Sequence, residues 1–211
     1  KAKSTDFFPG EKPNWTLLSL ISKGQDVPDL PSAQFNEIYD ACLLESGNLV
    51  FRASVNYGKK CLSGLFSLNK TGVKTIIVED NQIRTPVTEK LFSNSHIRFL
   101  SGWDNISDEY FFNGRNLLYL NIVFKEGLFS KHTNVYGWDG DSLQRVLASD
   151  DVLSVDGQNY TIRSAKAHGT GNGGDALLCY ITKAGLGYEK IGLAVHSDQK
   201  ITPIVQNVEI Q

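Results

Sequence analysis

The chain has 211 residues, 41% of them hydrophobic and 10% aromatic, with 21 Lys and Arg against 23 Asp and Glu. This apolar content excludes a disordered tail, because it can bury enough surface to offset the conformational entropy lost on folding. A net charge of −2 does not favour nucleic-acid binding, and no uncharged apolar run approaches the roughly 18 residues that cross a membrane. The length predicts one domain over 16–211, after an N-terminal extension over 1–15.

Most of the elements predicted along the chain are strands. Residues 49–56 alternate between apolar and polar positions, which indicates a strand with one buried face. Residues 73–78 are largely β-branched and also predict a strand. Residues 116–124 and 176–181 are continuous apolar runs, typical of strands that another layer covers on each face. Residues 191–195 carry small side chains on one face, which predicts close approach of a neighbouring sheet.

Helix signals are few. Residues 31–38 and 86–92 could each hold one helical turn. Residues 141–147 have the apolar spacing of a short helix behind a capping residue. The same stretch, however, matches other copies of a recurring strand pattern, and on that ground we predict a strand here.

That recurring pattern is an apolar strand followed by a polar turn and an aliphatic residue. Its copies are found at 18–27, 75–83, 145–152 and, in a weaker form, 203–208. Between the copies, a turn glycine precedes a strong strand at Gly47, Gly114 and Gly174. Self-similarity of this kind predicts three units, approximately 28–83, 84–152 and 153–208, each with four antiparallel strands. A further strand is predicted around 16–22.

One stretch of this pattern resembles a known family. Residues 44–51, Leu-Glu-Ser-Gly-Asn-Leu-Val-Phe, resemble the NxxGxxAF motif of bacterial tandem-repeat proteins of the choice-of-anchor type. Residues 64–66 are similar to a second element of that family and residues 24–28 to a third. The resemblance implies export, a β-propeller-like stack of four-stranded sheets and no established activity.

The number of units bears on how the chain completes its fold. Propellers have about 4–8 blades, so three units predict either a homo-oligomer or association with a missing portion of the propeller. The alternatives for the fold are another three-fold β architecture, such as a trefoil, and a β-sandwich.

Cysteine and methionine usage bears on compartment. The three cysteines, Cys42, Cys61 and Cys179, form no CxxC pair and do not suggest a zinc site. Apolar neighbours predict that Cys42 and Cys179 are buried thiols, and a Cys42–Cys61 disulfide is the alternative. The chain contains no methionine, which either removal of a leader or laboratory trimming explains. Together with the family resemblance, this predicts an extracytoplasmic location: periplasmic, cell-surface or secreted.

The candidate ligand-binding residues come from two Gly-Trp-Asp stretches. They are Trp103, Asp104, Asp108, Tyr110 and Trp138. The first four lie in an additional segment of the middle unit, and added loops in repeat proteins often carry binding sites. A flat ring beside hydrogen-bonding carboxylates suits a carbohydrate or a peptide. For each tryptophan the alternative is a packing role, and Asp139-Gly140 also reads as a hairpin turn beside Trp138.

No catalytic motif is present in the sequence. The glycine-rich residues 168–175 fit G-x-G-x-x-G spacing, but a strand follows them, which favours a hairpin loop over a nucleotide site. Asp139, Asp141, Asp150 and Asp151 do not match calcium-loop spacing, so we expect no metal and no other cofactor. We therefore expect an exported module that binds a glycan or a protein rather than an enzyme. The alternatives are a carbohydrate-active hydrolase with an Asp/Glu pair and a structural surface protein without a small ligand.

Overall fold

The computed structural model describes residues 20–44, 47–78, 110–112, 117–126, 130–170, 175–183, 189–197 and 199–209. Within these ranges the chain consists of strands, turns and loops and contains no helix, so the fold is all-β, as the sequence predicts. A membrane-spanning helix is accordingly not found among these residues.

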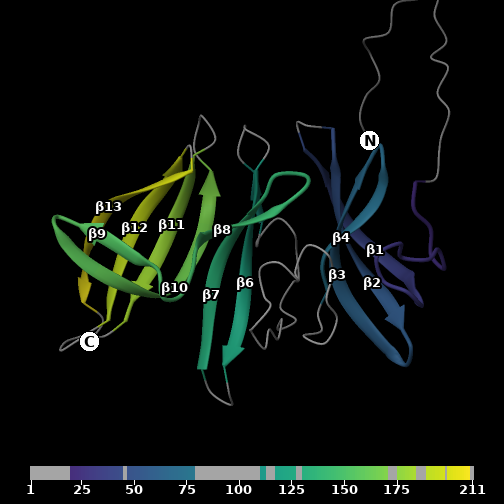
Figure 1. The fold of residues 1–211 in the computed structure, drawn as a ribbon, viewed down its shortest axis with the longest axis horizontal. Coiled ribbons are helices and arrows are strands. Elements are labelled where there is room, and N and C mark those ends of the chain that lie inside the picture. The colour runs from purple at the N-terminus through teal and green to yellow at the C-terminus, as the bar shows by residue number, and fades with distance from the viewer. Residues whose placement is uncertain are drawn as a thin grey trace, which may run out of the picture.

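The strands form three antiparallel sheets in which neighbours in the sequence are also neighbours in space (Figure 1). The first sheet contains β1 (Ala33–Leu43), β2 (Leu49–Tyr57), β3 (Lys60–Asn69) and β4 (Gly72–Val78). The second contains β5 (Tyr110–Phe112), β6 (Leu118–Glu126), β7 (Ser130–Trp138) and β8 (Leu143–Leu147). The third contains β9 (Val152–Val155), β10 (Gln158–Thr170), β11 (Ala176–Thr182), β12 (Lys190–Ser197) and β13 (Lys200–Glu209).

The third sheet has five strands where the sequence predicted four. The additional strand, β9, pairs with Gln158–Thr161 at the start of β10, whereas β11 pairs with Ile162–Thr170 on the other edge of β10. Register shifts after Ile162 and after Ala167 interrupt the second pairing. The long β10 therefore pairs with β9 along its first part and with β11 along its second part.

The three sheets pack face to face in a row (Figure 1). Leu65 and Ile77 of the first sheet pack with Leu118 and Trp138 of the second in one apolar cluster. Tyr119 of the second sheet packs with Tyr180 and other residues of the third in another. Because the first and third sheets cover the two faces of β6, residues 118–122 are all buried. This confirms the prediction from their continuous apolar run.

The face of the first sheet that points away from the second is covered by the chain's own N-terminal residues. Phe35, Phe51 and Phe66 lie on this face with ring centroids 5.0–5.8 Å apart. Val27 and Leu30 pack against them and are themselves buried. We call residues 20–32 the N-terminal cap, because they shield this end of the row of sheets.

Several local predictions are confirmed and others are wrong. Residues 143–147 form strand β8, so the strand predicted here is confirmed and the helical alternative is wrong. Residues 33–43 form strand β1, so the helical turn predicted over 31–38 is wrong there; alternate residues Ala33 and Phe35 are buried while β1 pairs with β2. Residues 20–22 are described and lie outside any strand, in contrast to the strand predicted around 16–22. Cys61 is an exposed free thiol, so it forms no disulfide with Cys42.

Candidate functional site

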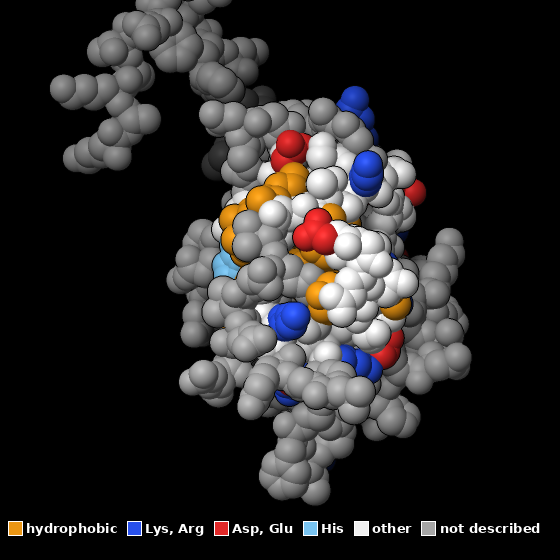
Figure 2. Space-filling model, turned by 90° about the vertical axis from the view of Figure 1, so that its left-hand side faces the viewer, with side chains coloured by type: hydrophobic (Ala, Val, Ile, Leu, Met, Phe, Trp, Pro, Cys, Tyr) orange, Lys and Arg blue, Asp and Glu red, His pale blue; other side chains and the backbone are white. Residues whose placement is uncertain are grey.

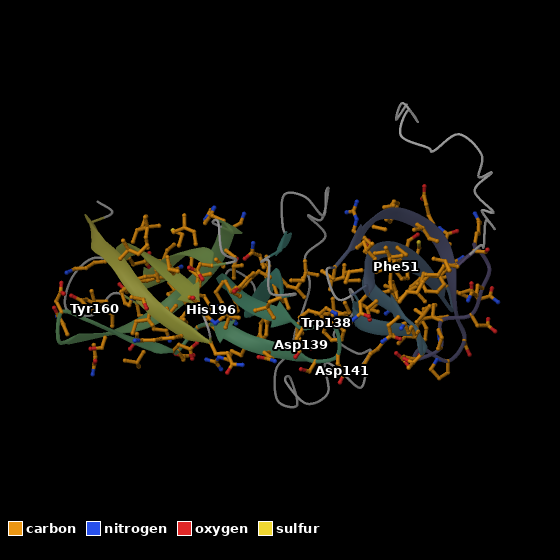
Figure 3. All side chains as sticks on the ribbon, turned by 90° about the horizontal axis from the view of Figure 1, so that it is seen from above. Phe51, Trp138, Asp139, Asp141, Tyr160 and His196 are labelled. Atoms are coloured by element: carbon orange, nitrogen blue, oxygen red, sulfur yellow. The ribbon has the colours of Figure 1, made fainter. Side chains whose placement is uncertain are left out.

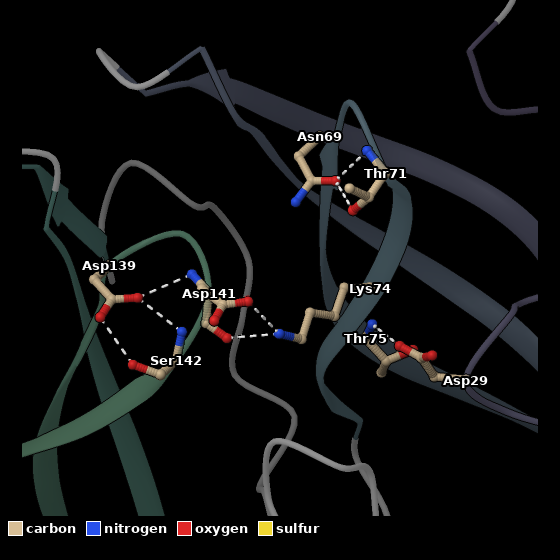
Figure 4. Close-up of polar contacts among 8 residues, drawn as sticks. All are labelled: Asp29, Asn69, Thr71, Lys74, Thr75, Asp139, Asp141 and Ser142. Atoms are coloured by element: carbon tan, nitrogen blue, oxygen red, sulfur yellow. Dashed lines mark hydrogen bonds and ion pairs between the residues drawn. The ribbon is translucent and has the colours of Figure 1, made fainter.

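The second Gly-Trp-Asp stretch forms a tight hairpin turn between β7 and β8 (Figure 4). The carboxylate of Asp139 accepts hydrogen bonds from the backbone N–H of Asp141 (2.9 Å), from the N–H and hydroxyl of Ser142 (2.7 and 2.8 Å) and from the Gln144 amide (2.8 Å). Partial burial alone would raise the pKa of Asp139, but these hydrogen bonds outweigh it and lower the pKa. This carboxylate is therefore a turn cap with its lone pairs already used.

Lys74 connects this turn to the first sheet. Its ammonium lies 2.8 Å from the Asp141 carboxylate and 2.7 Å from the Asp141 carbonyl oxygen (Figure 4). It also lies 5.6 Å from the centre of the Trp138 ring. On the neighbouring residue of β4, the Thr75 N–H donates to the Asp29 carboxylate of the N-terminal cap at 2.9 Å. Lys74 thus connects the first and second sheets, and Asp29 connects the N-terminal cap to β4. Because Asp141 is exposed to solvent, its ion pair with Lys74 adds little to stability.

The predicted ligand-binding residues have three different outcomes. Trp103, Asp104 and Asp108 lie outside the described residues. Tyr110 begins β5, and the structure describes its backbone only. Trp138 is fully buried between the first and second sheets (Figure 3), which corrects its assignment as a rim residue, since it has no exposed ring face for a ligand. Its packing role was the alternative that the sequence allowed.

The four aspartates considered for calcium belong to two separate turns and are each paired. Asp150 pairs with Lys183 at 2.5 Å, and this hydrogen bond lowers the pKa of Asp150. Asp151 pairs with Arg145 and also accepts the backbone N–H of Ala148 at 2.7 Å. Among the residues that the structure describes, no three His, Cys, Asp or Glu side chains come together as a metal cluster.

Polar groups between the second and third sheets also have structural partners. The Asn121 amide donates to the Ala167 carbonyl at 3.0 Å and accepts the Ala167 N–H at 2.8 Å, so a side chain of β6 completes the backbone hydrogen bonding of β10. The Tyr119 hydroxyl lies 2.7 Å from Nδ1 of His196 (Figure 3 labels His196). These buried pairs fix how the two sheets meet and do not line a cleft.

We expect the stability of the chain to depend on pH through His196. Burial lowers the pKa of His196 below its usual 6.5, and the nearby Asp175 opposes the shift in part. Below pH 6.5 the unfolded chain binds a proton that the folded chain resists, so the free energy of unfolding should fall as the pH decreases from there. Urea denaturation between pH 5 and 8 measures this fall. His196→Asn should show a shallower pH dependence, and an identical slope in both proteins would contradict the assignment.

The outer face of the third sheet is the candidate functional surface. Side chains at even positions of β11 and β12, such as Leu178, Tyr180 and Ala194, are buried toward the second sheet. Those at odd positions point the other way and form three cross-strand pairs. The pairs are Leu177 with Val195, Cys179 with Leu193 and Ile181 with Ile191. We call these six residues the outer apolar patch.

The outer apolar patch remains accessible to solvent. Leu177 and Leu193 are 38% and 37% exposed, and Ile204 on the neighbouring β13 is 55% exposed. The other four members of the patch are half-buried. Figure 2 shows the end of the molecule that the third sheet forms, with hydrophobic side chains exposed on it and charged side chains between and around them. A contiguous exposed apolar area on a folded domain is typical of a protein interaction site.

Small residues and a tyrosine support this surface from below. A Cβ atom added at Gly192 would lie 2.2 Å from Cζ of Tyr180, so the ring occupies the space that a side chain at 192 would need. The small residues of 191–195 predicted close approach of a neighbouring sheet, whereas this contact is with β11 of the same sheet. The Tyr180 ring of β11 therefore packs against β12 at Gly192, between Ile191 and Leu193.

Comparisons with known proteins leave the family open. No family model matches this sequence, and no curated protein matches it. Among solved structures, the chain is similar to the crystal structure of an N-acetylgalactosamine deacetylase from F. plautii in complex with blood group B trisaccharide, with 12% identity and a TM-score of 0.30. The match covers 85% of this chain and 55% of the deacetylase, so the chain spans about half the length of that protein. A likeness this distant carries no argument about function.

Proposed function

We propose that this chain is a binding module that associates with another protein through the outer apolar patch. The observation that carries the proposal is that Leu177 and Leu193 are accessible on a sheet whose other face is part of the core. Water contact with such side chains is unfavourable by about 25 cal/mol per Å², so covering them with a partner stabilises the complex.

The described polar groups support association over catalysis. Asp139, Asp150 and Asp151 are held by turns or ion pairs, and His196 is paired with Tyr119 in the interior. A glycosidase needs two carboxyl groups facing one cleft. Asp139 lies in one turn, and the adjacent Asp150 and Asp151 of the other turn are each paired with a basic side chain. The alternative of carbohydrate recognition by Trp103 and its neighbours stays a prediction, because that segment lies outside the described residues.

We also propose that the three sheets are successive repeat units of a propeller-like stack from an extracytoplasmic protein. The first two sheets fall within the predicted units 28–83 and 84–152, and the third extends one residue beyond each end of 153–208. In each sheet the turn glycine precedes the second strand of a four-stranded meander: β2, β6 and β11. On this view β9 is an addition to the third unit. The extracytoplasmic location depends on the resemblance to choice-of-anchor proteins.

The proposal is tested by capturing partners from an extract of the source cells. Immobilised wild-type chain, Leu193→Glu and Leu43→Glu are compared by quantitative mass spectrometry. Leu43→Glu is a matched control, since Leu43 is 68% exposed on the first sheet, remote from the patch. We expect at least one protein to be retained by the wild type and by Leu43→Glu and to be lost with Leu193→Glu. If all three retain the same set of proteins, the outer apolar patch is not a binding surface.

A further inference from the structure

We infer that the partner of the outer apolar patch is the same patch on a second copy of this chain, so that two third sheets pack face to face. This inference rests on the proposed function and names its partner.

The sequence of β11 is that of a strand covered on both faces. Its apolar run matches that of β6, where residues 118–122 are buried on both sides because sheets pack against each face. In β11 only the face with Leu178 and Tyr180 is covered, and Leu177 on the opposite face is accessible. In a strand with one face toward water, apolar residues ordinarily alternate with polar ones. In β11 the outward positions are instead the apolar Leu177, Cys179 and Ile181. The missing layer is therefore another sheet with an apolar face.

The N-terminal cap decides how a second copy can supply that layer. A closed ring of two chains would join the third sheet of each copy to the first sheet of the other. The first sheet's outward face is already occupied by Val27 and Leu30 of the cap, and Asp29 is hydrogen-bonded to β4. Ring closure would displace these buried residues. Pairing the two third sheets around a two-fold axis uses only the face that is accessible and leaves both caps in place.

Charge favours contact between identical faces. All six residues of the outer apolar patch are uncharged, and the charged side chains that Figure 2 shows among the hydrophobic ones come from neighbouring positions. A basic residue beside the patch is Lys166, which pairs with Cys179 from the neighbouring β10 and is exposed. Its aliphatic stem can extend along the rim of the contact while its ammonium stays in water. A two-fold interface requires this kind of self-complementary surface.

The size of the face predicts a reversible dimer. The outer apolar patch lies on β11 and β12, and together with the flanking β10 and β13 the face has four strands. At about 4.8 Å between strands and about eight residues per strand of about 3.3 Å each, this face presents roughly 500 Å² in projection. A standard specific interface buries roughly 800 Å² per partner, so this contact lies toward the lower end of the range once the side-chain relief is included. We therefore expect a dissociation constant on the order of micromolar.

Sedimentation velocity of the purified chain over a wide concentration series tests the inference. The wild type should pass from monomer to dimer as its concentration rises through the micromolar range. Leu193→Glu should remain a monomer at every concentration, with a dissociation constant at least 100-fold higher than that of the wild type. The reason is that the two-fold axis places the introduced charge in the interface twice. Leu43→Glu should dimerise as the wild type does. Leu177→Lys provides a second patch variant if Leu193→Glu loses its far-ultraviolet circular dichroism.

The outcomes separate this inference from the proposed function. A wild-type chain that stays monomeric at every concentration overturns the second copy as partner, and so does a dimer that survives both patch substitutions. If the monomeric chain still retains a different protein through Leu193, the binding surface stands and its occupant is that protein. If neither dimer nor retained protein depends on Leu193, both proposals are wrong.

Discussion

Replacing Trp138 with alanine is expected to lower the free energy of unfolding by about 3–5 kcal/mol, the range for removing a large aromatic residue from a core. Trp138 is fully buried and pairs across the sheet with Leu118 on one side and Leu143 on the other. Its ring is part of the cluster that joins the first and second sheets. The loss should therefore reduce the stability of the whole stack, and urea denaturation followed by circular dichroism measures it.

Trp138→Phe is the matched control for this prediction. The indole Nε1 of Trp138 is buried and has no hydrogen-bond partner among the described residues. Phenylalanine keeps an aromatic ring in the cluster and removes a buried donor that costs about 1–3 kcal/mol when unpaired. We expect it to cost less than half of what alanine costs. Equal and small effects of both substitutions would contradict the packing role and return Trp138 to the candidates for ligand binding.

Asn121→Ala is expected to destabilise the fold by about 2–4 kcal/mol, because it leaves two buried backbone groups unpaired at about 1–3 kcal/mol each. The side chain of Asn121 is the partner of both the N–H and the carbonyl of Ala167. Without it, the second and third sheets lose one of the polar contacts that join them, of which the Tyr119–His196 pair is another. Hydrogen exchange at the Ala167 amide should accelerate together with the loss in unfolding free energy.

Asn36→Ala makes the same chemical change where no second sheet is involved. The Asn36 amide donates to the Ser54 hydroxyl at 3.3 Å, within the first sheet, and is only part-buried. We expect this substitution to cost less than about 1 kcal/mol. A loss at Asn121 no larger than that at Asn36 would show that the Asn121 bridge does not hold the sheets together.

Strand positions were predictable from the sequence, because period-two alternation and continuous apolar runs are local properties. Residues 49–56, 73–78 and 176–181 all lie within strands, and the recurring pattern decided correctly for a strand over 143–147. The strand β1 was missed, because its buried positions Ala33 and Phe35 follow Pro31, which suggested a turn of helix. Pairing with β2 overrides that local signal.

Alternation of apolar and polar residues along a strand does not show how the sheets pack together or which face remains exposed. In β7 residues 134–138 are all buried, so nothing in the pattern told whether Trp138 faced a sheet or solvent. The apolar run of β11 correctly predicted a strand, but the prediction that both faces are buried is wrong within this chain, since Leu178 is covered and Leu177 is accessible. The sequence therefore showed the apolar residues of the outer apolar patch, but the pattern predicted that they are buried within the chain.

The thiol of Cys179 can report directly whether the outer apolar patch is covered by a second copy. Cys179 lies within the patch, half-buried, where burial raises the pKa of its thiol, and Cys61 is an exposed free thiol on the first sheet. Alkylation of both thiols by N-ethylmaleimide, resolved by peptide mass spectrometry at increasing chain concentration, compares the two sites within one molecule. Association through the patch predicts that Cys179 reacts progressively more slowly as concentration rises, while the rate at Cys61 stays constant. A Cys179 rate that does not change with concentration, or a parallel decrease at both thiols, would contradict association through the outer face of the third sheet.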